Sequence, residues 1–387
     1  MKQLQLNLRE GRSVAAKRCA SWFSVFLLAF LAACSSTPEK PTPTALVQFA
    51  PQLTVTPVWS AQAGPIATTS TLSVNTSRLA LVSQNGLLTV LNADSGALVW
   101  QVALNTPISA GVGSDGNRFS VITQANELVT LTDGKESWRV KLPASSFTAP
   151  LVAGGRVFVL TTDRTVLAFD GVSGQRLWSQ QRAGDALVLK QAGILTSFQD
   201  SLIVGLSGRL VAMSPSNGVA KWDALIGSSR GTNEVERLVD LVAGVSRVNQ
   251  TLCTRAYQTA VSCTDAAKGT NVWTRTASGH VGLSGNDTQV FGTESDGKMI
   301  TWNRLTGQVV WQSESLRFRG LTAPAFSEGQ LLVGDEQGWL HWLDPKNGQT
   351  VARVQLDASG VALAPLRVGK NWISVSKNGL VQAYRAE

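Results

Sequence analysis

Few residues of this 387-residue chain have the types and spacing that acid–base, nucleophilic or metal chemistry needs. His280 and His341 are the only histidines, too few for a histidine metal cage. The run 227–231 (Gly-Ser-Ser-Arg-Gly) matches Gly-x-Ser-x-Gly, but a nucleophile elbow needs a strand-to-helix turn followed by Asp and His. Asp335 and Glu336 lie beside a turn, and a solvated turn explains them better than acid–base work. The sequence therefore predicts no catalytic residue, no metal site and no cofactor.

The remaining candidates are cysteines. Cys253 and Cys263 flank one expected hairpin turn. A three-residue loop at 257–259 would place them opposite each other on one face, whereas a two-residue turn would place them on opposite faces and forbid a bond. An oxidising compartment favours a disulfide, and the alternative is two independent small core residues. Either arrangement is structural rather than catalytic.

Residues 1–33 have the pattern of a secretory signal. Five lysines and arginines precede an apolar run at 20–33, which is too short to span a bilayer comfortably and ends in small residues. Residues 31–34 (Leu-Ala-Ala-Cys) resemble the bacterial lipobox, where the cysteine is lipidated and the chain is cut before it. That resemblance implies acyl chains on Cys34 and, with Ser35 following, delivery to the outer membrane. The alternative is an ordinary signal whose cysteine is incidental.

Residues 34–52 are expected to form a lipidated tether. They hold four prolines and no hydrophobic periodicity, which predicts a semi-extended segment that lets the folded body stand off the membrane. Removing residues 1–33 takes away five positive charges and one negative charge, and so lowers the formal net charge from +8 to +4. So small a charge gives no argument for binding nucleic acid.

Residues 53–387 repeat one pattern. A glycine precedes a tryptophan by four residues six times, and in a seventh copy Gly348 has Ala352 in the tryptophan position. The six pairs are Gly96/Trp100, Gly134/Trp138, Gly174/Trp178, Gly218/Trp222, Gly269/Trp273 and Gly307/Trp311. Trp59 lies 41 residues before Trp100, in the same series. Turn pairs such as 85–86 (Asn-Gly) recur in phase between alternating apolar runs, which predicts β-hairpins.

A period near 42 residues, with about four short strands and one tryptophan in each unit, is typical of a β-propeller. Eight hairpin turns predict eight blades, but the last unit ends at Glu387 before its outer strand. A strand at 53–60, around Trp59, has no unit of its own. We therefore predict an all-β, eight-bladed propeller of four-stranded antiparallel blades, closed by the amino-terminal strand, which hides two sheet edges. The tryptophans are interpreted as packing residues between blades.

Two glycine intervals are the longest, 44 and 51 residues, from Gly174 to Gly218 and from Gly218 to Gly269. The surplus of the second falls in residues 223–241, which are rich in charge. Loops inserted in a propeller cluster on one rim and often form its binding face. A tolerated surface insertion is the alternative.

The lipobox, the proline-rich tether, the eight tryptophan-bearing blades and the insertion together resemble the BamB (YfgL) family of propeller lipoproteins, over essentially the whole chain. In that family, the loops that bind the POTRA domains of BamA include a Leu-x-Leu-Arg segment and an acidic pair two residues apart. The first corresponds to residues 187–190 (Leu-Val-Leu-Lys), with lysine in place of arginine. The second corresponds to Asp240, with Val242 at the partner position. Lysine keeps the charge but loses the bidentate fork.

The resemblance implies a non-enzymatic scaffold of the outer-membrane β-barrel assembly (BAM) complex. The chain would bind BamA and other BAM subunits as a monomer within the complex, and assist insertion of outer-membrane proteins from the periplasmic face of that membrane. The expected partner-binding residues are an apolar anchor and the polar residues around it: Leu187, Leu189, Lys190, Glu234, Arg237 and Asp240. The alternatives are a quinone-cofactor dehydrogenase, whose adjacent Cys-Cys pair is missing here, and a glycan-binding propeller.

Overall fold

The computed structural model describes residues 41–67, 69–183, 187–228 and 238–387. The chain divides into two compact units, Met1–Thr42 and Pro43–Glu387, and every strand among the described residues belongs to the second. The expected signal at 1–33 and the expected lipidation site Cys34 lie outside the described residues. In the part of the chain that is described, no helix is long and apolar enough to cross a membrane.

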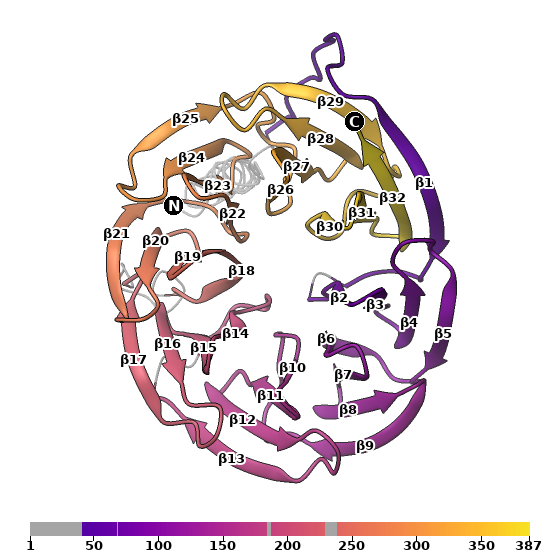
Figure 1. Cartoon of the computed structure of the whole chain (residues 1–387), viewed down its shortest axis with the longest axis vertical. Coiled ribbons are helices and arrows are strands. Elements are labelled where there is room, and N and C mark those ends of the chain that lie inside the picture. Colours follow the sequence, from indigo (N-terminus) through magenta and orange to yellow (C-terminus); the bar gives the residue numbers. More distant parts are fainter. Residues whose placement is uncertain (1–40, 68, 184–186, 229–237) are drawn as a thin grey trace, which may run out of the picture. The chain divides into compact units, whose positions relative to one another are not determined.

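Eight four-stranded antiparallel sheets stand side by side around a ring, as the repeats predict (Figure 1). In blades 1 to 7 the chain runs from the innermost strand to the outermost, so sequence order and sheet order agree. Blade 8 combines three strands from the carboxyl end with one from the amino end. The eight-bladed propeller closed by its amino-terminal strand is therefore confirmed.

The first four blades contain sixteen strands. Blade 1 consists of β2 (Ser73–Asn75), β3 (Arg78–Val82), β4 (Leu87–Asn92) and β5 (Leu98–Ala103), and blade 2 of β6 (Ile108–Ser114), β7 (Arg118–Thr123), β8 (Glu127–Thr132) and β9 (Lys135–Lys141). Blade 3 consists of β10 (Leu151–Ala153), β11 (Arg156–Leu160), β12 (Thr165–Asp170) and β13 (Arg176–Gln181), and blade 4 of β14 (Leu195–Phe198), β15 (Ser201–Leu206), β16 (Arg209–Met213) and β17 (Ala220–Leu225).

The other four blades complete the ring. Blade 5 consists of β18 (Leu241–Val248), β19 (Thr251–Ala256), β20 (Ala260–Asp265) and β21 (Thr270–Thr276), and blade 6 of β22 (Ser284–Gly285), β23 (Gln289–Thr293), β24 (Met299–Asn303) and β25 (Val309–Ser313). Blade 7 consists of β26 (Ala325–Ser327), β27 (Gln330–Gly334), β28 (Trp339–Leu343) and β29 (Thr350–Gln355), and blade 8 of β30 (Leu366–Val368), β31 (Asn371–Val375), β32 (Leu380–Ala386) and β1 (Val55–Gln62).

The two middle strands of each blade form the core. Strands such as β3 and β11 are runs of apolar, often β-branched residues that are buried on both faces, because each blade is packed between two others. Outer strands such as β13 alternate between exposed and half-buried residues, which fits a sheet edge with one wet face. The tight turns between the middle strands use residues with positive φ, such as Gly86 at +90°.

Each tryptophan of the repeat covers the glycine turn of the next blade. A Cβ added to Gly307 would lie 2.5 Å from the Trp273 ring, so only glycine fits beneath it. The indole N–H of Trp273 also donates to the backbone oxygen of Arg304 in the same turn, at 2.7 Å. Trp138, Trp178, Trp222 and Trp311 donate in the same way to turns of the following blades. The Gly-x-x-x-Trp spacing is thus a lock between neighbouring sheets.

The missing tryptophan at Ala352 falls beside the seam of the ring. The outer strand of blade 8 is β1, which pairs with β32 from Val55/Ala386 to Gln62/Leu380, so two chain ends meet where the other blades have a glycine turn. Thr54 and Glu387 exchange backbone hydrogen bonds of 2.8 and 3.0 Å there. Blade 8 has no glycine turn for a tryptophan at position 352 to cover. The smaller Ala352 instead packs in the core beside Leu53.

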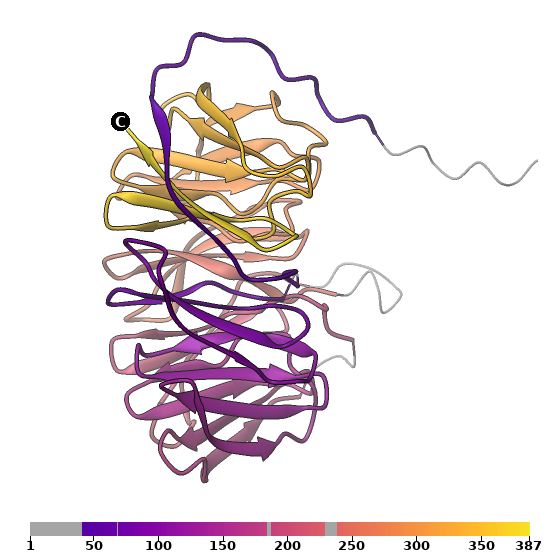
Figure 2. The same ribbon diagram turned by 90° about the vertical axis from the view of Figure 1, so that its right-hand side faces the viewer.

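One face of the ring, here called the crossover face, carries the connections between blades together with the turns between the middle strands. Backbone bonds join each connection to the turn of the blade before it, for example Leu104 to Gly86, Leu142 to Asn126 and Leu356 to Gly338. Figure 2 shows the ring edge on, with the strands crossing from this face to the opposite one. The opposite face carries the glycine turns that the tryptophans cover.

Candidate partner-binding face

The two longest connections on the crossover face meet at their ends. Residues 182–194 join blades 3 and 4, and residues 226–240 join blades 4 and 5. Gly193 forms an antiparallel bridge with Val242, and the N–H of Ala243 donates to the oxygen of Ala192 at 2.8 Å. The N–H of Gly193 also donates to Thr148 Oγ1, which lies in the connection between blades 2 and 3, at 2.9 Å. The two long intervals of the sequence therefore contribute to one surface, fixed at its base by backbone bonds.

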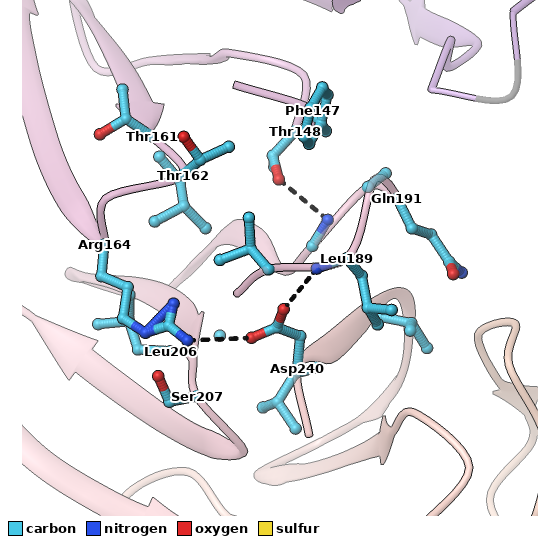
Figure 3. Close-up of a pocket in the computed structure, with 17 residues that line it drawn as sticks. Phe147, Thr148, Thr161, Thr162, Arg164, Leu189, Gln191, Leu206, Ser207 and Asp240 are labelled. Atoms are coloured by element: carbon cyan, nitrogen blue, oxygen red, sulfur yellow. Dashed lines mark hydrogen bonds and ion pairs between the residues drawn. The ribbon is translucent and has the colours of Figure 1, made fainter. Parts of the chain in front are cut away.

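Asp240 holds the segment 187–190 from below. Its Oδ2 accepts a hydrogen bond of 2.9 Å from the backbone N–H of Leu189, and its Oδ1 lies 4.0 Å from Arg164 Nη2 (Figure 3). The same guanidinium donates to the backbone oxygen of Leu187 at 3.2 Å. Arg164 is 6% exposed, so this ion pair is screened little by solvent. One acid and one base thus fix the backbone of the segment at two points.

Fixing the backbone in this way presents its side chains. Leu187 is 39% exposed although its backbone is held by a buried arginine, and Lys190 is exposed. Leu189 is half-buried. The structure therefore brings together Leu187, Leu189, Lys190 and Asp240 of the expected residues. Glu234 and Arg237 lie outside the described residues.

A cavity of about 60 Å³ lies beneath the segment. It is lined by apolar side chains such as Leu160, Leu189 and Leu206, and by polar ones that include Arg164 and Ser207. Within the described residues, Arg164 Nε and Ser207 Oγ are buried without a hydrogen-bond partner. A void with unpaired polar groups in its wall is a place where ordered water can satisfy them.

Arg164 is the residue of this site that sequence reasoning missed. Its position is the second of a turn pair, where five of the eight blades have glycine, and its φ is +61°. A large side chain rarely adopts a left-handed conformation unless other contacts repay the strain. Arginine at a glycine position of the repeat was thus a usable signal, and the contacts with Leu187 and Asp240 are what repay it.

The structure corrects the interpretation of Asp335 as a solvated turn residue. Its side chain is fully buried and accepts hydrogen bonds from Arg319 Nε at 2.7 Å and His341 Nε2 at 2.9 Å. Although burial opposes ionisation, the bond from His341 and the N–H of Trp339 hold the pKa of Asp335 below its ordinary value. The turn folds Asp335 inward because its Oδ1 caps the N–H groups of the hairpin. Glu336 is exposed, as expected.

An Asp–His pair is also what orients a general base, but this one lacks the geometry of catalysis. Arg353 Nε donates to His341 Nδ1 at 3.2 Å, so the ring accepts on one side and donates to Asp335 on the other. Burial lowers the pKa of His341, which keeps the ring neutral. With arginine in the place of a nucleophile, the pair is structural. Ser229 of the Gly-x-Ser-x-Gly match lies outside the described residues, which hold no cluster of three or more metal-ligating side chains.

Cys253 and Cys263 form a disulfide in blade 5. The hairpin loop between β19 and β20 has three residues, 257–259, so the two cysteines lie directly opposite each other with their Cα atoms 4.0 Å apart. Both are fully buried. The bond therefore braces the blade whose first strand follows Asp240.

Fold and site define the class of the protein: an eight-bladed β-propeller with an exposed apolar and basic segment fixed on one face. A family model described as "Outer membrane protein assembly factor BamB" matches residues 84–313 and 305–387. The outer membrane protein assembly factor BamB of Burkholderia pseudomallei is 31% identical over 379 residues, which cover 97% of this chain and 98% of that protein. The chain belongs to the BamB family.

Solved structures agree with the fold. The crystal structure of BamB from Moraxella catarrhalis has a TM-score of 0.79 and 22% identity, and the match covers 86% of this chain and all of that one. The quinohemoprotein alcohol dehydrogenase of Comamonas testosteroni has a TM-score of 0.65 at 12% identity, and the match covers 86% of this chain and 76% of that one. Identities this low show a shared architecture alone.

Proposed function

We propose that this protein is a non-enzymatic scaffold subunit of the outer-membrane β-barrel assembly complex. It binds the POTRA domains of BamA through the crossover face at Leu187, Leu189 and Lys190, and so assists insertion of outer-membrane proteins. Acyl chains on Cys34 hold it, as a monomer within the complex, at the periplasmic face of the outer membrane. The relatives named as outer membrane protein assembly factors support the role in assembly.

The observation that carries the proposal is that Asp240 and Arg164 fix the backbone of the segment 187–190, in which Leu187 is exposed. A flexible loop would lose conformational entropy on binding, whereas a segment held by Asp240 and Arg164 has lost it already. Leu187 then offers apolar area to a partner, and Lys190 offers a charge at the rim that steers the encounter. Asp240 acts as a positioning residue, because its carboxylate is directed to the backbone of Leu189.

The test is capture of BamA from detergent-solubilised outer membranes. Leu187→Glu and Leu189→Glu, made together, place two charges in the proposed contact and are expected to reduce capture at least tenfold. Val172→Glu is the matched control, since Val172 is 71% exposed in a turn on the opposite face and its variant is expected to capture BamA like the wild type. Undiminished capture by the double variant would remove these leucines from the site.

The alternative of a dehydrogenase gains no support from the residues described. The likeness to dehydrogenases is one of fold, and the buried Asp335–His341 pair is directed to arginines rather than to a cavity with a nucleophile. Adding pyrroloquinoline quinone and calcium and recording the absorption spectrum separates the two functions: a scaffold leaves the spectrum of the free quinone unchanged.

A further inference from the structure

A segment before the first strand lies along the outer edge of blade 7. The N–H of Thr44 donates to the oxygen of Arg317 at 3.0 Å, and the N–H of Gln52 donates to the oxygen of Val351 at 2.8 Å. Between these points Leu46 packs on an apolar cluster of blades 6 and 7. Figure 2 shows this indigo segment passing from the start of β1 toward the crossover face. Residues 43–52, called the strap below, are therefore bound to the propeller over their length.

Two arginines hold the strap between its ends: Arg319 in the connection that enters blade 7, and Arg353 on β29. Arg319 Nη1 donates to the backbone oxygen of Thr44 at 2.9 Å, and Arg353 Nη1 donates to that of Val47 at 3.3 Å. The Arg353 guanidinium also lies 5.0 Å from the centre of the Phe49 ring, within the range of a cation–π contact. Both arginines thus recognise an extended backbone, and one of them recognises an aromatic side chain as well.

The buried Asp335–His341 pair explains why these arginines are aimed outward. Arg319 gives one edge of its guanidinium to Asp335, and Arg353 gives its Nε–H to His341. Because a guanidinium is a rigid fork, fixing one edge fixes the direction of the other. A single carboxylate also leaves two arginines with an excess positive charge, which the carbonyl oxygens of the strap help to solvate. The hydrogen-bonded network of Asp335, His341 and the two arginines thus presents donors to an extended backbone, and it places no nucleophile beside the histidine.

We propose that blade 7 is a docking site for the protein's own amino-terminal segment, and that this docking turns the crossover face toward the lipid anchor. The second part rests on the lipidation of Cys34 in the proposed function. The chain takes ten residue-to-residue steps from Cys34 to Thr44, against nineteen from Cys34 to Leu53. At ~3.3 Å per residue the reach of the free tether falls from about 60 Å to about 33 Å. Thr44 is bound to Arg317 in the connection between blades 6 and 7, so the strap leaves the propeller on the crossover face, which also carries Leu187 and Lys190. Anchor and partner would then act on one side.

The docking is tested by proteolysis of the lipid-anchored protein on the outside of liposomes. Chymotrypsin cuts after Leu46 or Phe49 and so releases the propeller into the supernatant. Arg353→Gln and Leu46→Ser are each expected to speed that release about tenfold or more relative to the wild type, while Arg139→Gln, a change in an exposed ion pair on β9, leaves it unchanged. Equal release rates in all four proteins would overturn the docking. Protein found in the supernatant before protease is added would instead overturn the lipid anchor.

The orientation is tested by energy transfer to a dye in the bilayer. Because the two cysteines of the propeller are bonded to each other, a single new cysteine can be labelled in the lipid-anchored protein on liposomes. Asn378→Cys labels an exposed turn on the crossover face, and Leu305→Cys labels an exposed turn on the opposite face. Transfer is expected to be stronger from position 378, and the difference is expected to shrink when Arg353→Gln is added. Equal transfer from both positions, or stronger transfer from 305, would overturn the orientation.

Discussion

Alanine substitutions at two glycines of the repeat separate backbone strain from the packing of tryptophan. Gly134 and Gly307 hold the same place in the repeat, in turns of two and five residues, with φ of +76° and +67°, so alanine carries a similar left-handed cost of about 1–2 kcal/mol at each. The two glycines differ in how close an added Cβ would come to the tryptophan of the preceding blade. At Gly307 it would lie 2.5 Å from the Trp273 ring, whereas at Gly134 the nearest atom of Trp100 would be 3.5 Å away.

The expected losses of stability follow from those distances. A contact of 3.5 Å is ordinary van der Waals packing, so Gly134→Ala is expected to lower the free energy of unfolding by about 1–2 kcal/mol, the backbone cost alone. At Gly307 the indole must move by about 1 Å, which strains its bond to Arg304 and adds an overpacking cost of about 1–3 kcal/mol. The total for Gly307→Ala is therefore about 2–5 kcal/mol.

The measurement is the urea midpoint of each variant, followed by tryptophan fluorescence and compared with the wild type under one set of conditions. Gly307→Ala is expected to unfold at clearly lower urea than Gly134→Ala. Equal midpoints would refute the claim that tryptophan and glycine lock neighbouring blades, because only the shared backbone cost would then remain.

Three further predictions concern the supports of the structure. Asp240→Asn weakens the charge-assisted hydrogen bond to Leu189, a kind of bond worth about 1.5 kcal/mol, and removes the charge that faces buried Arg164; it is expected to lower the urea midpoint and, while the variant is still folded, to reduce capture of BamA about tenfold, and full capture would contradict it. The wild-type midpoint is expected to fall as the pH drops from 7 to 5, because the lowered pKa of His341 keeps it neutral in the folded state while the unfolded histidine gains a proton near pH 6.5; an equally steep fall in His341→Gln would exclude this histidine. Replacing Cys253 and Cys263 by alanine, which opens a ten-residue loop, is expected to cost about 2–3 kcal/mol, read from the midpoints, and no loss would contradict a bracing role.

The architecture could be predicted because the contacts between neighbouring blades depend on the same residue types at the same spacing in most of the repeats. A glycine that must accept positive φ, and a tryptophan four residues later that covers the next such turn, recur at a fixed spacing. Even the exception at Ala352 carries information, since it marks where the chain ends meet. The closing strand followed from counting, because the eighth unit lacked one strand and the residues around Trp59 lacked a partner.

The residues that hold the segment 187–190 in place could not be predicted in the same way. Arg164 and Asp240 lie 76 residues apart, and only the ring brings the turn of blade 3 beneath the segment before blade 4. Asp335 looked like one more polar turn residue, because nothing local in the sequence shows that Arg319 and His341 converge on it. The strap could not be predicted for a related reason: proline spacing and a lack of periodicity describe its backbone, while its binding depends on two arginines 275 and 306 residues further along the chain.

The central claim, that the segment 187–190 on the crossover face contacts BamA, is tested most directly by site-specific photocrosslinking in intact cell envelopes. A photoreactive residue at position 187 is expected to capture BamA, while one at position 305, which is more exposed and lies on the opposite face, is expected not to. Capture of BamA from 305 and not from 187, or capture of a different protein from 187, would contradict the claim.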